Sequence, residues 1–285
     1  MLLTPQAIDR VVIAALAEDA PWGDATSDAF LPDGATASAQ LVAREAGVLS
    51  GAEVFSRTMF QADESITTAV LQGDGEHFEP GAVLATVSGP ARGVLLGERV
   101  ALNLVQRMSG IATVTARYVE AVAGTRARIV DTRKTTPGLR ALERHAVRSG
   151  GGGNHRFSLS DAVLAKDNHL AVLTASGISL TDAIIRARAR ISHTTHLEVE
   201  VDRLDQIEPV LAGGVDTIML DNFSLDELRE GIAIVAGRAL VEASGGVNLD
   251  TVRAIAETGV DIISVGALTH SARALDLGLD LSIEA

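Results

Sequence analysis

The hydrophobic pattern of the chain changes twice within its first 122 residues. Apolar residues recur at helical spacing over residues 5–19 and predict an amphipathic helix there. Between residues 35 and 90, short alternating stretches separated by Gly and Asp predict a small antiparallel sheet, with strands at 39–43, 66–71 and 83–87. These residues therefore predict an α+β arrangement of one helix and a small sheet.

A second helical pattern covers residues 95–122 and is interrupted at Ser109-Gly110. Its polar positions are interpreted, on the sequence alone, as one solvated helix face: Glu98, Arg99, Asn103, Gln106 and Arg107.

From residue 127 onward, strand-like apolar runs alternate with helical patterns. The strands are predicted at 127–130, 162–165, 197–201, 216–220, 239–243 and 261–265, and the helices at 136–148, 178–191, 203–212, 224–236 and 249–258. Glu200, Asp221 and Glu242 are 21 residues apart and Ser264 follows 22 later, a repeat that suits βα units with tight connections. The prediction is an α/β fold whose parallel sheet curls into an open, incomplete six-stranded barrel.

Polar residues end each of these six predicted strands. They are Asp131 to Lys134, Lys166 to His169, Glu200, Asp221-Asn222, Glu242 to Gly246, and Gly266. Because active sites of such barrels form at the carboxyl ends of the strands, we expect these residues to converge at one mouth.

The most chemically distinctive stretch is the motif Asp131 to Arg140. Between Arg126 and Arg156 there are eight Arg or Lys and two acids, a local charge of +6 in a chain of net charge −13. A cationic pocket on an acidic protein predicts a small anionic ligand. Lys134 and Lys166 are the chain's two lysines beside 22 arginines. A lysine ammonium suits phosphate or pyrophosphate and an arginine fork suits carboxylates, although two surviving surface lysines could also be a matter of chance.

Glycine turns after the last two strands predict a phosphate site. Ser244-Gly245-Gly246 precedes a helix, and Val265-Gly266-Ala267 ends the following strand. Exposed backbone N–H groups and a helix N-terminus bind oxyanions at this place in phosphosugar barrels. The glycines at 150–153, followed by His155-Arg156, predict a further anion-binding segment, with a flexible loop as the alternative.

Composition narrows the class of protein. At 285 residues and 47% hydrophobic residues, the chain can form two domains. The absence of cysteine excludes disulfides and thiolate chemistry and fits a reducing compartment. There is no apolar run of about 18 residues and no signal-peptide pattern. The low aromatic content of 3% argues against base stacking. We therefore expect a cytoplasmic protein with neither a nucleic-acid nor a membrane partner.

Taken together, these motifs resemble the quinolinate phosphoribosyltransferase family, also called decarboxylating nicotinate-nucleotide pyrophosphorylases. The resemblance is collinear over essentially the whole chain, and the ten-residue core motif is its most specific part. It rests on Glu45–Val48, Asn103-Leu104, Ser109–Thr113, Asp131–Arg140, His155-Arg156, Lys166–His169, Glu198–Val201, Leu220–Asn222, Glu242–Gly246 and Gly266–Ser271. Ala20-Pro21, Ser158 and Ala165 depart from the family's usual pattern, at positions that flank the site.

The resemblance implies three parts of the chain and a dimer. The parts are an N-terminal α+β sandwich-like domain at 1–108, an open α/β barrel at 109–268, and a tail at 269–285 that returns to the first domain. In the implied homodimer, which could assemble further into a hexamer, Arg99 of one subunit completes the neighbour's site.

The resemblance also implies roles for individual residues. Quinolinate carboxylates would be bound by Arg99, Arg133 and Arg156 with His155, and Thr132 would contact substrate. Lys134, Lys166 and His169 would neutralise the pyrophosphate of phosphoribosyl pyrophosphate together with Mg²⁺. Glu200 and Asp221 would hold the ribose hydroxyls directly or through Mg²⁺, a cation that prefers oxygen ligands. The 5′-phosphate would lie on Ser244, Gly245, Gly246, Val265, Gly266 and Ala267.

Three other functions compete with this interpretation. The first is a paralogous phosphoribosyltransferase-like enzyme associated with molybdate uptake, against which the complete set of three arginines argues. The second is a class I phosphosugar aldolase with Lys134 or Lys166 as its Schiff-base residue. The third is a non-catalytic sensor of a phosphorylated metabolite, which intact candidate acids and lysines disfavour.

Overall fold

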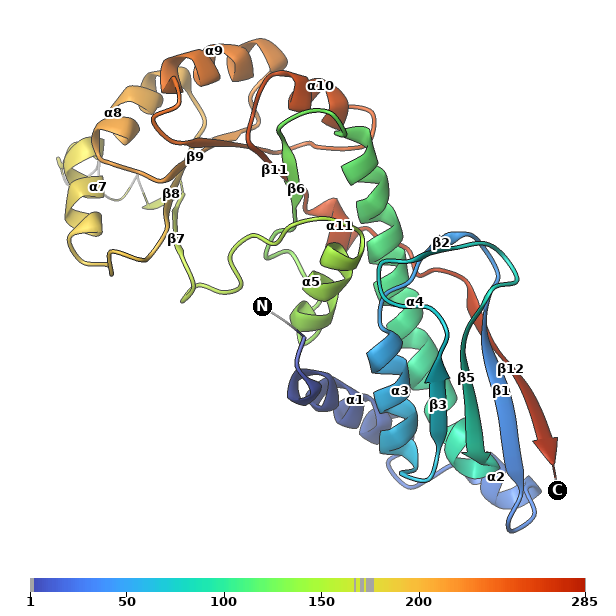
Figure 1. Ribbon diagram of the computed structural model, residues 1–285. Coiled ribbons are helices and arrows are strands. Elements are labelled where there is room, and N and C mark those ends of the chain that lie inside the picture. Colours follow the sequence, from blue (N-terminus) through green and yellow to red (C-terminus); the bar gives the residue numbers. More distant parts are fainter. Residues whose placement is uncertain (1–2, 167, 170–171, 173–176, 285) are drawn as a thin grey trace. The chain divides into compact units, whose positions relative to one another are not determined.

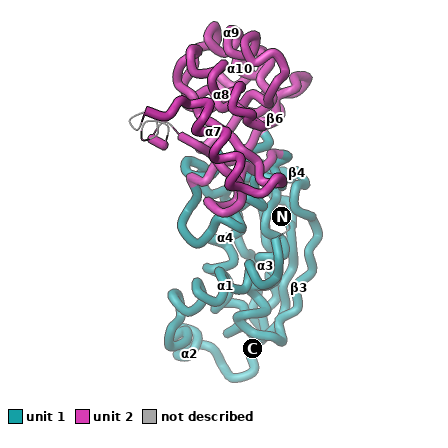
Figure 2. Tube along the Cα trace, turned by 90° about the vertical axis from the view of Figure 1, so that its left-hand side faces the viewer, with its two compact units in different colours: residues 1–116, 135–151, 268–285 teal, residues 117–134, 152–267 magenta. Residues whose placement is uncertain are grey.

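The computed structural model describes residues 3–166, 168–169, 172 and 177–284 of the chain. These residues form two compact units, distinguished by colour in Figure 2. The first unit comprises residues 1–116, 135–151 and 268–285, and the second comprises residues 117–134 and 152–267. The chain therefore passes from one unit to the other four times, and two of these passages lie directly after the motif lysine Lys134 and directly before Leu268.

An antiparallel sheet forms the framework of the first unit (Figure 1). Its strands occur in the order β12-β1-β5-β3, and a separate two-stranded pair joins β2 to β4. The bounds are β1 Thr36–Ala43, β2 Gly47–Val48, β3 Thr67–Val70, β4 His77–Phe78, β5 Val83–Pro90 and β12 Leu277–Glu284. Alternate residues of β1 are buried, so one face of the sheet forms part of the core and the other carries small polar side chains.

Helices cover the apolar face of this sheet. Those wholly or mainly in the first unit are α1 Pro5–Asp19, α2 Ala25–Phe30, α3 Ala52–Ala62, α4 Ala91–Ala121, α5 Arg140–Ser149 and α11 Ala267–His270. Phe55 and Met59 of α3 and Ala101 and Val105 of α4 lie in one core cluster with Leu41 of β1, all almost fully buried. The helix predicted over residues 5–19 is confirmed, with Thr4 capping its N-terminus and a proline in the first turn.

The structure corrects three predictions about helices. Residues 52–62 form a helix inside the region where the sequence pattern predicted a small sheet, and residues 25–30, for which no element was predicted, form another. The long helix α4 runs without interruption through Ser109-Gly110. The helix predicted from residue 136 begins only at Arg140, because Gly138 has a φ of +84° that an α-helix cannot contain.

Close packing explains the Ser109–Thr113 stretch of α4. A Cβ atom built on Gly110 would lie 3.1 Å from the carbonyl carbon of Arg273 and would overlap its oxygen, so only glycine lets the C-terminal segment pass. Ser109 Oγ accepts a hydrogen bond from Ser50 N–H, and Thr113 Oγ1 accepts one from Val48 N–H. This stretch is therefore a seam on which other parts of the first unit pack.

A parallel six-stranded sheet in the order β6-β11-β10-β9-β8-β7 forms the second unit. The strands are β6 Arg128–Val130, β7 Val163–Ala165, β8 Leu197–Val201, β9 Thr217–Asp221, β10 Leu240–Ser244 and β11 Ile262–Ser264. The helical segments are α7 Leu180–Arg188, η1 Leu204–Gln206, α8 Ile207–Ala212, α9 Leu225–Val235 and α10 Val252–Glu257. In Figure 1 the helices α7 to α10 follow one another around the outside of the strands.

All six predicted strands are present, and the predicted open α/β barrel is confirmed. Within the described residues β6 and β7 form the two edges and do not pair with each other. Consecutive strands from β7 to β11 are neighbours, while β6 lies beside β11. All strands run in the same direction, so their carboxyl ends meet at one rim of the barrel. In the described part of the chain, no helix has both the length and the apolar character needed to cross a membrane.

Candidate active site

A cavity of about 380 Å³ opens within the second unit among residues at the ends of its strands. It is lined by Thr132, Arg133, Lys134, His155, Arg156, Leu164, Lys166, Glu200, Met219, Asp221, Glu242, Ser244 and Ser264. Nine of the site residues named from the sequence line this cavity: Thr132, Arg133, Lys134, His155, Arg156, Lys166, Glu200, Asp221 and Ser244. The convergence expected from barrel geometry is therefore found for residues at or just after the carboxyl ends of five of the six strands.

Buried Asp131 organises the motif loop that follows β6. Its carboxylate accepts hydrogen bonds from the backbone N–H of His155 and from the side-chain amide of Asn154, both at 2.7 Å. Gly153 donates its N–H to the carbonyl of Ile129 at 2.8 Å and forms an isolated parallel β-bridge with Val130. A side chain at Gly153 would press against Val130. Residues 153–155 thus lie alongside β6, which brings His155-Arg156 to the same cavity as Arg133.

Two guanidinium groups share one wall of this cavity. Burial lowers the pKa of Arg156, and the positive charge of Arg133 lowers it further. Arg156 also donates from Nη1 to the carbonyl of Ala162 at 3.0 Å, which fixes its direction. Two cations held close together favour an anion beside them, and planar guanidiniums pair well with carboxylates.

His155 forms a buried cluster with Glu198 and Glu242. The sequence analysis assigned His155 to the site and expected Glu242 at its mouth, but gave neither glutamate an individual role. His155 Nε2 is 3.0 Å from Glu198 and 3.6 Å from Glu242. Burial, followed by the charge of Glu198, raises the pKa of Glu242 to about 8. Glu242 is therefore protonated at neutral pH, which limits the negative charge of the cluster.

His155 is held through both of its ring nitrogens. Burial would lower its pKa, but the hydrogen bond to Glu198 and the charge of Glu242 outweigh burial and raise it. The N–H of Arg156 donates to Nδ1 at 2.8 Å, which favours the neutral ring with its proton on Nε2. Because Nδ1 accepts this hydrogen bond it carries no proton, so we assign the neutral ring in this geometry although the pKa of His155 is raised. The ring then links the Arg156 backbone to the two buried glutamates.

The lining of the cavity also contains an ammonium paired with a carboxylate. Lys166 Nζ forms an ion pair with Glu200 Oε2 at 2.5 Å. Asp221, the last residue of β9, accepts a hydrogen bond from the Asn222 side chain at 2.7 Å. The side chain of Lys134 is exposed on the motif loop, and its backbone N–H donates a hydrogen bond to Thr132 Oγ1 at 3.1 Å. The cavity therefore combines cations with acids that can accept hydroxyl groups or a hard cation.

The glycine turns lie next to the lining residues. Gly245 and Gly246 have φ values of +91° and +62°, and a side chain on Gly245 would collide with Asn222. Val265 is buried and donates its N–H to Val130 at 2.9 Å, so the turn Val265-Gly266-Ala267 begins beside the end of β6. Both turns follow strands whose last residues, Ser244 and Ser264, line the cavity.

Seven of the sixteen predicted site residues are not among those that line the cavity. Five belong to the glycine turns next to it, Gly245, Gly246, Val265, Gly266 and Ala267, and the other two are Arg99 and His169. Arg99 is exposed on α4 in the first unit. His169 is exposed and bonds to the backbone of Lys166 through its N–H and Nδ1. Asp167, part of the Lys166–His169 motif, lies outside the described residues.

Two sets of side chains have the donor chemistry to hold a metal ion. Glu200 and Asp221 offer carboxylate oxygens at the cavity. His155, Glu198 and Glu242 offer one nitrogen and two oxygens within 4.8 Å of one another. In the second set the ring proton of His155 already occupies the centre, so hydrogen bonding accounts for that cluster. The first set suits a cation that prefers oxygen.

Comparison with known proteins gives similarity over nearly the whole chain. Residues 24–109 match the model for the N-terminal domain of quinolinate phosphoribosyl transferase, and residues 111–280 match that for its C-terminal domain. A nicotinate-nucleotide pyrophosphorylase [carboxylating] from Mycobacterium leprae is 45% identical over 94% of both chains. A probable one from Bacillus subtilis is 41% identical over 93% of this chain and 90% of the relative. Among solved structures, NadC from Streptococcus pyogenes superposes with a TM-score of 0.94 at 42% identity, covering 100% of each chain.

Proposed function

The chain belongs to the quinolinate phosphoribosyl transferase family, and we propose that it transfers the phosphoribosyl group of phosphoribosyl pyrophosphate to quinolinate. The products are nicotinate mononucleotide, CO2 and pyrophosphate, as in the de novo synthesis of NAD. The observation that carries this proposal is the single cavity that combines two arginines, both lysines and two strand-end acids. Such a cavity matches a dicarboxylate and a phosphorylated sugar at the same time.

Arg133 and Arg156 would bind the two carboxylates of quinolinate. Their mutual repulsion, which contributes to the lowered pKa of Arg156, is relieved when an anion lies between them. His155, whose ring nitrogens already bond to protein, would hold the Arg156 backbone in place. The direct contact of His155 with a carboxylate that the family resemblance implies stays a prediction.

Phosphoribosyl pyrophosphate would occupy the side of the cavity with Lys134 and Lys166. The lysines would neutralise the pyrophosphate, assisted by His169, while Glu200 and Asp221 accept the ribose hydroxyls. The turns at Ser244–Gly246 and Val265–Ala267 would bind the 5′-phosphate through their backbone N–H groups. Glu200 and Asp221 are also the residues that would hold Mg²⁺, which when bound would offset the negative charge of the pyrophosphate.

The reaction needs little covalent help from the protein. The ring nitrogen of quinolinate attacks C1 of the ribose while the C1–O bond to pyrophosphate breaks. The resulting pyridinium accepts the electron pair left at ring carbon 2 when the carboxylate departs as CO2, and a proton from solvent then completes the ring. The residues of this chain orient the reactants and stabilise charge. A decarboxylated but unribosylated pyridine trapped as the first product would contradict this order.

The aldolase alternative receives no support from the cavity. A Schiff-base lysine needs an apolar pocket or a neighbouring cation that favours the neutral amine. Lys166 is paired with Glu200, and Lys134 is exposed.

We also propose a cytoplasmic homodimer in which Arg99 completes the partner's cavity, with a hexamer as a higher assembly. The lack of cysteine suits a reducing compartment. The exposed position of Arg99 on α4 is compatible with a contact to another subunit.

The decisive experiment is an assay of the purified protein with quinolinate, phosphoribosyl pyrophosphate and Mg²⁺, following nicotinate mononucleotide and released CO2. Nicotinate in place of quinolinate is the control. Product from quinolinate alone supports the proposal, and Lys134→Ala and Arg133→Ala should then each reduce turnover at least about 100-fold. No product from either acid would contradict it and favour the paralogous enzyme.

Subunit mixing tests the contribution of Arg99. Arg99→Ala and Lys134→Ala should each be inactive alone. After exchange of subunits, a heterodimer has one intact site if Arg99 acts across the interface, so the mixture should recover about a quarter of wild-type activity. No recovery, with exchange verified by mass, would contradict the proposed role of Arg99.

A further inference from the structure

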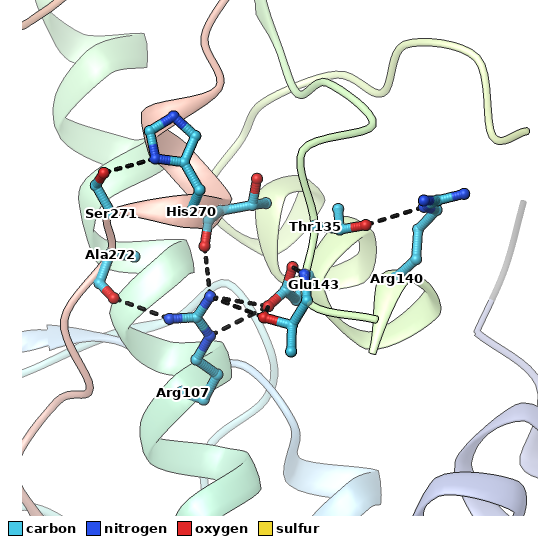
Figure 3. Close-up of polar contacts among 9 residues, drawn as sticks. Arg107, Thr135, Arg140, Glu143, His270, Ser271 and Ala272 are labelled. Atoms are coloured by element: carbon cyan, nitrogen blue, oxygen red, sulfur yellow. Dashed lines mark hydrogen bonds and ion pairs between the residues drawn. The ribbon is translucent and has the colours of Figure 1, made fainter. Parts of the chain in front are cut away.

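A buried ion pair in the first unit involves two residues to which the proposed function assigns no role. Glu143 of α5 is fully buried, and Arg107 of α4 forms an ion pair with it at 2.8 Å (Figure 3). The sequence pattern had placed Arg107 on a solvated helix face, and the structure corrects this. Its side chain is about three-quarters buried, and its guanidinium donates to Glu143 and to the carbonyls of Thr269 and Ala272.

Glu143 fixes the residues directly after the motif lysine. Thr136 donates its N–H to Glu143 Oε2 at 3.1 Å and its hydroxyl to Oε1 at 2.7 Å. Arg107 donates to the same Oε1 from both Nε and Nη2. Thr136 stands two residues after Lys134 in the chain, so the carboxylate anchors one end of the loop that presents Lys134 to the cavity.

Arg107 fixes the residues directly after the second glycine turn. It donates from Nη2 to the carbonyl of Thr269 and from Nη1 to the carbonyl of Ala272, the latter at 2.9 Å. Figure 3 shows the guanidinium between this segment and Glu143. Thr269 is buried and follows Gly266-Ala267 by two residues. The guanidinium of Arg107 therefore helps to anchor two segments, the one that follows the Lys134 loop, through Glu143, and the one that follows the turn at residues 265–267.

We infer that Arg107 and Glu143 are positioning residues that set where the Lys134 loop and the Gly266-Ala267 turn present their groups to phosphoribosyl pyrophosphate. This inference rests on the proposed function. Lys134 is proposed to bind the pyrophosphate and the turn to bind the 5′-phosphate, the two anionic ends of one substrate. An error of about 1 Å in such an anchor is enough to lower the rate about 100-fold.

Arg107→Lys is the principal test, because it keeps the charge and removes the planar fork. The ammonium of a lysine at this position cannot donate at the same time to Glu143 and to the two carbonyls that Arg107 bonds from different nitrogens. We expect kcat/KM for phosphoribosyl pyrophosphate to fall about 10- to 100-fold, as for other residues that orient a binding group. The KM for quinolinate should change less, because only Arg133 of its two arginines lies on the Lys134 loop, whereas Arg156 lies on another segment, held by Asp131.

Arg57→Lys is the matched control. Arg57 forms a two-pronged ion pair with Asp9 between α3 and α1, and its side chain is 29% exposed compared with 25% for Arg107. It has no hydrogen bond to the Lys134 loop or to residues 269–272 among the described contacts. Both variants lose a comparable pair in the first unit, so a purely structural role predicts equal effects on activity.

Thr136→Val provides a milder change that keeps the ion pair intact. It removes the hydroxyl bonded to Glu143 and leaves the backbone N–H in place. We expect the same selective rise in the KM for phosphoribosyl pyrophosphate, about 3- to 10-fold, with the wild-type melting temperature retained within about 3 °C. This variant decides the matter if Arg107→Lys does not fold.

The outcomes separate this inference from the proposed function. If the wild type makes no nicotinate mononucleotide, the proposed function fails. If the wild type is active and folded Arg107→Lys and Thr136→Val keep its kcat/KM for phosphoribosyl pyrophosphate, the positioning role is overturned. Equal losses in Arg107→Lys and Arg57→Lys, or equal shifts in the KM of both substrates, also overturn it.

Discussion

Gly110 offers a sharp test of the packing described for α4. In an exposed helix, replacing glycine by alanine stabilises by about 1 kcal/mol. Gly110 is fully buried, and the methyl group of Gly110→Ala would lie 3.1 Å from the carbonyl carbon of Arg273 and overlap its oxygen. The obstacle is backbone and cannot swing aside as a side chain does. We therefore expect Gly110→Ala to destabilise the fold, whereas helix propensity alone predicts that it stabilises.

The size of the stability loss follows from the contacts that are disturbed when the segment at Arg273 is displaced. Displacing the segment at Arg273 strains a well-packed site, at a cost of about 1–3 kcal/mol. It also weakens the bonds from Leu275 N–H to the Gln106 carbonyl and from Arg107 to the Ala272 carbonyl, each 2.9 Å long and each contributing about 1 kcal/mol. After the gain in propensity is subtracted, we expect a net loss of about 2–3 kcal/mol.

Two measurements check this expectation. The thermal midpoint of Gly110→Ala should fall by about 4–10 °C, and hydrogen exchange at the Leu275 amide should accelerate. Gly97→Ala on the same helix is the control, because its methyl group would meet the flexible thioether of Met59 at 3.1 Å and the methyl of Ala62 at 3.2 Å. If Gly110→Ala is as stable as Gly97→Ala and keeps Leu275 protected, the reasoning is refuted.

Three further predictions concern buried and paired acids. Glu242→Gln should leave stability unchanged below pH 4.5 and should stabilise the fold progressively as the pH rises towards 8. The reason is that the raised pKa of Glu242 penalises its ionised form in the folded state only. Denaturation at pH 4 and pH 9 measures this, and equal effects at both pH values would contradict it. Asp131→Ala should lower the free energy of unfolding by about 3 kcal/mol and loosen Arg156, because Asn154 loses its acceptor at a buried carboxylate. The unfolding midpoint and the KM for quinolinate measure these two effects, and Asp131→Asn should change both less. Glu45→Gln should destabilise by at most about 1 kcal/mol at neutral pH, because the hydrogen bond from the largely exposed Arg273 holds the pKa of Glu45 at about 2. The difference should disappear as the pH falls from 4.5 towards 2, and a difference that persists at pH 2 would contradict this assignment.

The barrel strands were predictable because each leaves a simple trace in the sequence. A strand such as β9 is buried on both faces and reads as a short apolar run, and its last residue, Asp221, marks the rim. Helix α3 was not predicted, since its eleven residues lie among alternating stretches that indicate strands. The late start of α5 depends on the left-handed conformation of Gly138, which follows from the path of the loop.

The cavity residues were predictable where they follow strands, and not where they lie beneath the rim. Glu198 and Glu200 are two residues apart and therefore on one face of β8, and a charged residue inside a buried strand was the available signal for Glu198. Nothing in the pattern of α4 could reveal the partner of Arg107. Glu143 and the carbonyls of Thr269 and Ala272 are far away in the sequence, and helical periodicity does not encode such distant contacts.

Strand β12 has a consequence for how the chain is made. Residues 277–284 pair with the whole of β1, Leu277 with Ala43 and Glu284 with Thr36, so β1 gains this partner only after all six barrel strands have been synthesised. While the ribosome builds the six barrel strands, β1 has an open edge that can pair with a neighbouring nascent chain. The first unit therefore cannot reach its final form in step with synthesis. Its folding ends with a closing step that depends on the release of residues 277–284 from the exit tunnel.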